Sequence, residues 1–219
     1  MNVTTGSLIG QPVERAEDRR FLNGTGQFVY DLQRLNMLHA VILRSPIAHG
    51  RIRKIDPSAA LQRPGVHAVI TAAAVGAEIP NIPLRLANLP EFKSYLQPVI
   101  AKDKVRYVGE PLAVVIAETQ ALAEDALESI DVNIEPLPAL PDRHAAAAAA
   151  SLLFEGTGTN RAVRYAVAFG DADAAFANAD YTRRESFHCH RLTALPLESR
   201  GLIAEWDGAA QKLTIFGAT

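Results

Sequence analysis

The stretch VRYVGEPLAVVIAETQALAEDALESIDVNIEPLPAL, residues 105–140, decides the fold because it places a strand, a helix and a second strand in close succession. Leu112–Ala117 is a continuous apolar run rich in valine, which is typical of a strand covered on both faces. Asp131–Glu135 alternates between polar and apolar residues, which predicts a strand with one face in water. Between them, apolar residues recur at helical spacing after Thr119, the expected N-cap. The segment therefore predicts a central strand, a covering helix and a neighbouring strand.

The residues before this stretch alternate between strands and short helices. Strands are predicted at Met37–Leu43, Arg51–Ile55 and Val66–Thr71. Asp56 and Pro57 predict the start of a short helix, because aspartate caps helices and proline suits the first helical position. The proline-rich residues 76–100 predict a long, ordered surface excursion. This order favours an α/β (α+β) domain with a mixed sheet that ends near Leu140.

A second section of the chain follows a predicted linker. We expect an N-terminal arm at residues 1–18, a first domain at 19–140, a proline- and alanine-rich linker at 141–160 and the beginning of a second domain at 161–219. Within the last range the pattern predicts strands at Arg164–Phe169, Tyr181–His190, Gly201–Trp206 and Lys212–Phe216, and a helix at Asp171–Ala179. We expect the sheet of this section to be completed by residues outside the sequence.

Composition excludes several classes of protein. The 24 acidic and 22 basic side chains give a net charge of −2 without a basic block, so nucleic acid is not an expected partner. A single cysteine, Cys189, excludes an internal disulfide framework and an iron–sulfur cluster ligated by cysteines of this chain alone. No apolar run approaches the ~18 residues of a transmembrane helix, and no export signal is recognisable. We therefore expect a cytoplasmic protein that does not bind a membrane.

Two carboxylates stand at turns where burial could make them proton acceptors. Glu110 lies in a Gly-Glu-Pro turn that enters the central strand, and Glu198 follows a proline in another turn. Capping a turn, or pairing with Arg106 or Arg200, is the favoured interpretation of both. Neither is assigned a catalytic role.

Other reactive side chains lack the partners that their chemistry needs. His188 and His190 would face the same side of a predicted strand, roughly 7 Å apart, but no third or fourth metal ligand is evident. Cys189 between them is interpreted as a small strand residue, and Ser45 has no evident His–Asp partners. The two Gly-Thr-Gly sequences are interpreted as turns, because neither follows a buried strand and opens a helix. The sequence thus assigns no catalytic or metal-binding residue, and its cofactor contacts stay unknown.

Several sequence words, in order along the chain, resemble the large subunit of the molybdenum hydroxylases, the xanthine dehydrogenase, aldehyde oxidase and carbon monoxide dehydrogenase family. They are Glu17-Asp18-Arg19-Arg20-Phe21 with Gly24-Thr25-Gly26, Arg44-Ser45-Pro46 with Ala48-His49, Pro64-Gly65-Val66, Val108-Gly109-Glu110-Pro111, Glu135-Pro136-Leu137-Pro138 and Leu195-Pro196-Leu197-Glu198. Gly50 and Asn133-Ile134 depart from the usual wording. Each word is weak alone, and the ordered set is specific.

The resemblance implies that residues 19–140 are an α/β-hammerhead domain and residues 161–219 the incomplete start of a molybdenum-cofactor-binding domain. Such enzymes insert a water-derived oxygen at a carbon centre and pass electrons to FAD and 2Fe-2S groups on a medium and a small partner subunit. The resemblance also implies a molybdenum–pterin dinucleotide in the complete subunit, whose first contact is a glutamine expected directly after Ala218-Thr219. We expect this segment to be mainly structural, without molybdenum or turnover on its own. A non-catalytic scaffold, or a gene-split subunit completed by another chain, is the alternative, and the substrate is not indicated.

Overall fold

The computed structural model describes residues 9–84, 89–190 and 192–218, and the chain divides into two compact units. One unit spans residues 36–182, and the other combines residues up to Leu35 with residues 183–219. The first eight residues of the predicted arm, and residues 85–88 of the predicted excursion, lie outside the described part.

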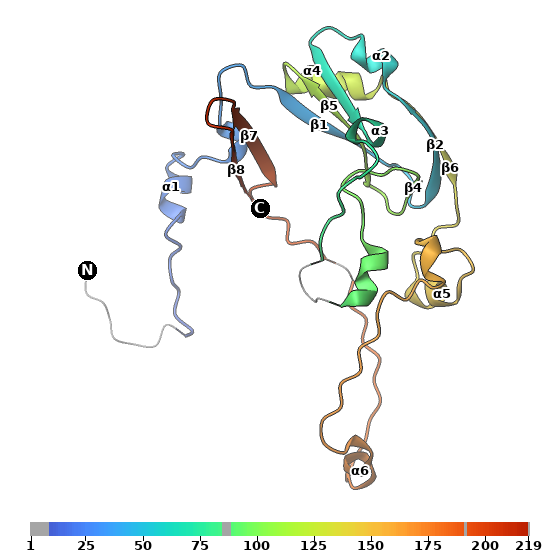
Figure 1. Ribbon diagram of the computed structural model, residues 1–219. Helices are drawn as coiled ribbons and strands as arrows, with labels where there is room; N and C mark the ends of the chain where they lie inside the picture. The colour runs from blue at the N-terminus through green and yellow to red at the C-terminus, as the bar shows by residue number, and fades with distance from the viewer. Residues whose placement is uncertain (1–8, 85–88, 191, 219) are drawn as a thin grey trace. The chain divides into compact units, whose positions relative to one another are not determined.

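The predicted central strand forms the middle of a three-stranded sheet in the unit of residues 36–182. β5 (Pro111–Ala117) lies between β1 (His39–Arg44) and β3 (Val66–Thr71) and runs antiparallel to both (Figure 1). Its valine-rich run is largely buried, because it has a strand on either side and a helix against the sheet. The prediction of a covered central strand is confirmed.

The predicted helix covers this sheet as α4 (Gln120–Leu127). The Thr119 side chain caps it by accepting the N–H of Leu122 at 3.2 Å. Ala123 and Ala126 are fully buried in one cluster with Val115 of β5. Small side chains on this helix face let the helix lie close to the sheet.

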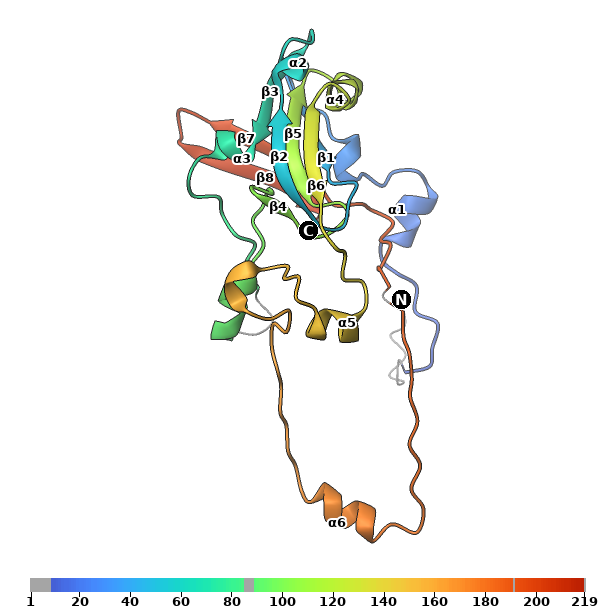
Figure 2. The same cartoon turned by 90° about the vertical axis from the view of Figure 1, so that its right-hand side faces the viewer.

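A second sheet places β2 (Gly50–Asp56) between β4 (Lys104–Val105) and β6 (Asp131–Pro136), all antiparallel. β2 and β6 run side by side along the domain (Figure 2). Along β6, Val132 and Ile134 are half-buried while the residues between them are exposed, as the alternating pattern predicted. Both also pack against a second apolar cluster, which is centred on Leu112. The stretch of residues 105–140 therefore contributes a strand to each of the two sheets.

Short helices fill the connections of this unit. They are α2 (Ser58–Leu61), α3 (Ala72–Val75), the 3₁₀ helix η2 (Pro90–Tyr95), α5 (Arg143–Ala148), the 3₁₀ helix η3 (Glu155–Thr157) and α6 (Ala172–Ala177). Asp56 Oδ1 accepts the Ser58 N–H at 3.0 Å, but Pro57 occupies the N-cap position, so the helix begins one residue later than predicted. Asp171 Oδ1 caps α6 as predicted, through the N–H of Ala174. None of the described helices is long and apolar enough to cross a bilayer.

The second unit contains α1 (Asp18–Leu22), the 3₁₀ helix η1 (Val29–Asp31) and a hairpin of β7 (Gly201–Asp207) and β8 (Lys212–Ala218). The hairpin confirms the last two predicted strands. The strands predicted at residues 164–169 and 181–190 are wrong, since both segments are described and neither forms a strand. The physical reason is that a strand needs a hydrogen-bonded neighbour, and neither segment belongs to any of the sheets described.

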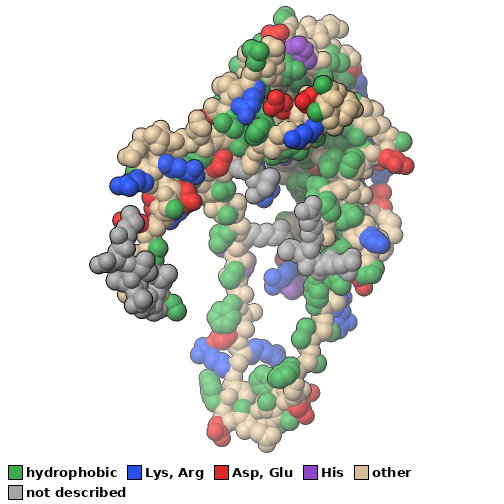
Figure 3. Space-filling view, turned by 60° about the vertical axis from the view of Figure 1, so that its left-hand side comes forward, with side chains coloured by type: hydrophobic (Ala, Val, Ile, Leu, Met, Phe, Trp, Pro, Cys, Tyr) green, Lys and Arg blue, Asp and Glu red, His purple; other side chains and the backbone are tan. Residues whose placement is uncertain are grey.

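Hydrophobic side chains of the segment that carries α6 are exposed, as Figure 3 shows for this part of the surface. Val167, Phe169 and Phe176 are each largely accessible to solvent. The hydrophobic pattern of this segment therefore does not correspond to a buried core within the described residues.

Candidate functional site

Glu110 is the most deeply buried ionisable side chain of the described residues. It is 0% exposed, and its Oε2 atom accepts the backbone N–H of Arg106 at 2.5 Å. Its other oxygen, Oε1, is buried and has no hydrogen-bond partner among the described residues. A buried carboxylate is costly when ionised, because burial removes the water that would stabilise its charge.

The turn that carries Glu110 is fixed to the end of β1 by backbone hydrogen bonds. Ser45 N donates to Glu110 O at 2.9 Å, and Gly109 N donates to Ser45 O at 2.8 Å. The Arg44 guanidinium donates to Gly109 O at 2.8 Å. Gly109 has a φ of +92°, a conformation that glycine adopts without steric cost. The Gly-Glu-Pro sequence thus serves as a tight entry into β5 that brings its glutamate inside.

The burial of Glu110 changes the pKa of its carboxyl group. Burial raises the pKa of Glu110 above its ordinary value, and the N–H and positive charge of Arg106 oppose that effect. Of the two predicted roles, Glu110 takes that of a turn cap, because its carboxylate accepts the backbone N–H of Arg106. No ion pair joins it to the Arg106 guanidinium, which is engaged elsewhere. Arg106 Nε donates to Leu153 O at 3.0 Å, and Arg106 Cζ lies 4.6 Å from the centroid of the Phe154 ring.

Three cationic side chains contact the segment Leu152–Glu155, here called the Phe154 segment: Lys104, Arg106 and Arg51, of which Arg51 lies 3.6 Å from Glu155 Oε1. Lys104 Nζ donates to Leu152 O at 2.8 Å and lies 3.2 Å from Glu155 Oε1. Arg106 binds Leu153 and Phe154, and the Tyr95 ring meets the Phe154 ring edge-on with centroids 5.4 Å apart. The sequence analysis missed this arrangement. The feature that marks it is the burial of Lys104, and burial cannot be read from the sequence.

The expected linker is ordered around Asn160. Its side-chain amide donates to Ala146 O at 3.0 Å and to Ser151 O at 2.9 Å, and its Oδ1 accepts the Leu153 N–H at 3.0 Å. Within the predicted linker, alanines 145–148 belong to α5, with Asp142 as its N-cap. The reason is local, since alanine has a high helix propensity and needs only a cap to start a helix.

The serine and histidine of the Arg44–His49 stretch have structural partners. Ser45 Oγ donates to Ile47 O at 2.8 Å, so its hydroxyl is committed to a turn rather than to a catalytic base. His49 is 2% exposed, and its Nδ1 lies 2.7 Å from Pro138 O. Since a carbonyl oxygen only accepts, Nδ1 carries the hydrogen of this contact. Nε2 is buried without a partner among the described residues.

Glu198 lies in the other unit and accepts a backbone hydrogen bond. Its Oε1 takes the N–H of Val29, at the start of η1, at 3.0 Å. This contact joins two parts of the chain that are far apart in sequence. The geometry suits the role of a cap, with no second titratable group bonded to the carboxylate.

His188 and His190 do lie near each other, with ring centroids 4.9 Å apart, closer than the predicted spacing. Both are exposed, as is the free Cys189. The described residues contain no group of three His, Cys, Asp or Glu side chains that could hold a metal ion. The pair alone supplies too few ligands for zinc.

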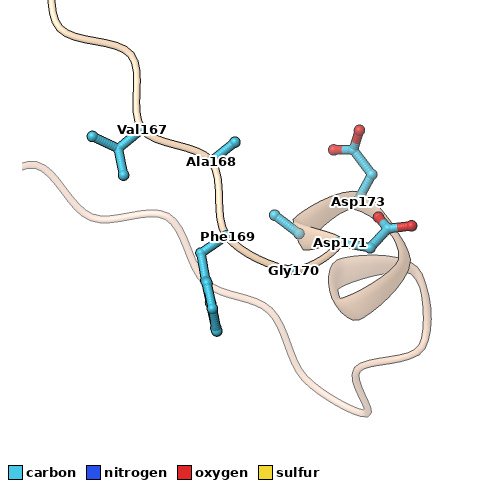
Figure 4. Close-up of a pocket in the computed structure, with 7 residues that line it drawn as sticks. Val167, Ala168, Phe169, Gly170, Asp171 and Asp173 are labelled. Carbon is cyan, nitrogen blue, oxygen red and sulfur yellow. The ribbon is translucent and has the colours of Figure 1, made fainter.

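A shallow hollow beside α6 is lined by residues 167–173 (Figure 4). Asp171 and Asp173 supply its charged groups, and Phe169 points along its side. Asp171 is already engaged as the helix cap. All of its lining residues are exposed, so the hollow offers little water-excluded volume.

Two protein-family models match this chain, one after the other along the sequence. Residues 23–138 match the family described as aldehyde oxidase and xanthine dehydrogenase, a/b hammerhead domain, and residues 153–219 match the molybdopterin cofactor-binding domain. Among curated relatives, the nicotine 6-hydroxylase large subunit of Paenarthrobacter nicotinovorans is 35% identical over 98% of this chain and 26% of its own length. The carbon monoxide dehydrogenase large chain of Hydrogenophaga pseudoflava is 36% identical over 91% of this chain and 26% of its own.

Solved structures give the same result. Quinoline 2-oxidoreductase from Pseudomonas putida 86 aligns with a TM-score of 0.81 and 34% identity, covering 96% of this chain and 27% of its own. The chain therefore spans about a quarter of the length of the relatives it matches. By the hammerhead match, which covers more than half of its residues, the chain belongs to the aldehyde oxidase and xanthine dehydrogenase family of molybdenum oxidoreductases.

Proposed function

We propose that this chain is the N-terminal part of the large subunit of a molybdenum-dependent hydroxylase or dehydrogenase, and that its own role is mainly structural. The observation that carries the proposal is the order of the two family matches, a hammerhead domain followed by a molybdopterin cofactor-binding domain, on one chain. The first part corresponds to the two sheets and α4, which form the best-buried core of the described residues. We also retain the proposed boundaries of 19–140 for the hammerhead domain, 141–160 for the linker and 161–219 for the cofactor-binding part.

The reaction class follows from the family. When bound in the complete subunit, a molybdenum–pterin dinucleotide would supply the transfer of a water-derived oxygen to a carbon centre. Electrons would then pass to 2Fe-2S and FAD groups on partner subunits in the cytoplasm. The substrate class stays open, because the named relatives differ in the compound that each acts on.

The residues present do not by themselves fit that cofactor. The hollow beside α6 carries two aspartates, whose charge opposes an anionic dinucleotide. Within the described residues there is also no cluster of metal-ligating side chains. We therefore assign no step of the reaction to Glu110, Glu198, His188 or His190, and propose that these residues build the scaffold.

Metal content tests the proposal directly. The complete polypeptide that carries this sequence should contain about one molybdenum per chain, and a fragment of residues 1–219 should contain none, by inductively coupled plasma mass spectrometry. Stoichiometric molybdenum in the fragment would contradict the structural role. A complete polypeptide without molybdenum, from cells that load other molybdenum enzymes, would contradict the function.

The DNA that follows codon 219 separates the remaining alternatives. A reading frame that continues into Gln-x-Pro-His supports the large subunit. A stop codon followed by a second gene with those words would indicate a gene-split subunit. A stop codon without such a gene would indicate a scaffold protein.

A further inference from the structure

Arg106 contacts Glu110 through its backbone and the Phe154 segment through its side chain. A charge on Glu110 would compete with the Phe154 segment for the guanidinium. The Arg106 backbone N–H holds Glu110 Oε2, while its guanidinium points to the Phe154 segment, donating to Leu153 O and lying over the Phe154 ring. The guanidinium is close enough to Glu110 that its charge lowers the pKa of that carboxyl, although no hydrogen bond joins the two side chains. A negative charge on Glu110 would therefore attract a cation that now binds a neutral carbonyl and an aromatic ring.

The carboxylate itself has little else to stabilise a charge. Glu110 is completely buried, and its Oε1 has no partner among the described residues. Its Oε2 accepts the backbone N–H of Arg106, and a backbone hydrogen bond from Tyr107 also lowers its pKa. Burial raises the pKa of Glu110, so its carboxyl ionises in the folded domain at a higher pH than an ordinary glutamate does. The ionised form needs a counter-charge, and a buried charge that lacks one destabilises a fold strongly.

The other ionisable groups on the elements around Glu110 are Arg44, His49, Arg51, Lys104, Tyr107 and Glu155. Arg44 binds Gly109 O and His49 binds Pro138 O. Lys104 and Arg51 both pair with Glu155. Tyr107 is partly exposed, and its pKa is raised first by burial and then by the charge of Glu110. Arg106 is the cation whose charge acts on Glu110.

We propose that Glu110 is a proton-controlled switch for the Arg106 clamp on the Phe154 segment. With Glu110 neutral, the guanidinium binds the Phe154 segment. When Glu110 releases its proton to solvent, the guanidinium turns toward the carboxylate and the segment loosens. Lys104 still contacts Leu152 O and Glu155, and Arg51 still pairs with Glu155. The Phe154 ring still meets the Tyr95 ring, and the Leu153 N–H still donates to Asn160 Oδ1, so the segment loosens without detaching. Since this segment lies at the start of the cofactor-binding match, the switch would tune how firmly the two matched regions are joined.

Hydrogen–deuterium exchange measured by mass spectrometry tests the switch on the purified full-length protein. The peptide covering residues 150–158 is followed at about pH 5 and about pH 8, with rates corrected for the intrinsic pH dependence of amide exchange. In the wild type the corrected rate should rise roughly threefold to tenfold at the higher pH, because local opening becomes easier. In Glu110→Gln, which cannot ionise, the corrected rate should be the same at both values.

Glu128→Gln is the matched control, because Glu128 is exposed on the domain surface and should leave the wild-type response intact. Arg106→Gln removes the clamp and should give fast exchange at both pH values, so it tests the switch even where Glu110→Gln does not fold. An equal response in the wild type and Glu110→Gln, no response in the wild type, or a wild-type response retained in Arg106→Gln would each overturn the proposal. A loosening spread equally over β2 and β6 would overturn it as well.

Discussion

Lys104 and Glu155 form an ion pair of unequal burial, with Nζ 3.2 Å from Oε1 and side chains that are 8% and 66% exposed. The lysine also donates to Leu152 O at 2.8 Å. The pair therefore joins β4 to a segment about fifty residues later in the sequence. The positive charge of Lys104, in hydrogen-bond contact, lowers the pKa of Glu155.

Replacing the buried partner of this pair should cost more than replacing the exposed one. Lys104→Met keeps the aliphatic stem but leaves Leu152 O without its donor, and should lower the free energy of unfolding by about 1–3 kcal/mol. Glu155→Gln should have a smaller effect, because the amide oxygen of glutamine can still accept a hydrogen bond from Nζ. The position is also exposed, where an ion pair contributes little. Urea unfolding measures both. Lys102→Met, at an exposed position, is the control, and an equal loss in all three variants would contradict the assignment.

A methyl group at Gly65 should be destabilising for two reasons. Its φ of +77° is unfavourable for a residue with a side chain, and the added Cβ would lie 2.7 Å from Leu122 Cδ1 on the covering helix. Gly65→Ala should cost about 1–3 kcal/mol in the free energy of unfolding. Gly158→Ala has a similar φ of +71° with no atom within 4 Å of the new carbon, so it measures the backbone contribution alone. If the two variants lose the same stability, the contact with Leu122 is irrelevant.

The cap of the covering helix should be measurable in isolation. Thr119→Ala removes the oxygen that accepts the Leu122 N–H and should lower the free energy of unfolding by about 1 kcal/mol. Thr119→Ser keeps an oxygen at the same position and should recover most of that loss. Thermal denaturation monitored by circular dichroism compares the three proteins. A serine variant as unstable as the alanine variant would show that the methyl group of Thr119, and not its oxygen, stabilises the helix.

Asp56 should make the domain sensitive to acid. Hydrogen bonds with Ser58, then the bond with Lys54, lower the pKa of Asp56 from 3.8 to about 2. Because the folded-state pKa lies below the unfolded value, its stabilising contribution is present above about pH 4 and is lost as the pH falls toward about 2. Asp56→Asn keeps a capping oxygen but cannot ionise, so its stability should fall less steeply over that range.

Urea unfolding between about pH 2 and about pH 6 checks this slope. Asp103→Asn, which changes an exposed aspartate without a side-chain partner among the described residues, should keep the slope of the wild type. The interpretation fails if Asp56→Asn and the wild type lose stability in parallel.

Much of the hammerhead domain could be predicted from the sequence because its signals are local. The valine run of β5, the alternation of β6 and the capping position of Thr119 each follow from periodicity or from the chemistry of one side chain. Each element was therefore located to within a residue or two. The two strands of the β7–β8 hairpin were predicted on the same basis, although their pairing was not.

The strands predicted at 164–169 and 181–190 show the limit of that reasoning. A β pattern states what a segment prefers once a neighbour is available, whereas the neighbour depends on residues elsewhere. For the alanine-rich stretch the sequence analysis named no helix, yet a single cap at Asp142 was enough to start α5.

The sequence by itself determined the main strands of the hammerhead domain, the covering helix and the family, since these depend on order and spacing along the chain. It predicted one mixed sheet, whereas the structure pairs these strands in two antiparallel sheets, because strand pairing depends on contacts distant in sequence. Only the tertiary structure decided what the charged side chains do. Glu110 is buried because a turn folds it inward, and Arg106 faces Phe154 because a segment 48 residues later returns to β4. Burial and long-range pairing set the local dielectric and the available partners, so the same glutamate could be a solvated surface group or a proton-binding switch, and spacing cannot distinguish the two.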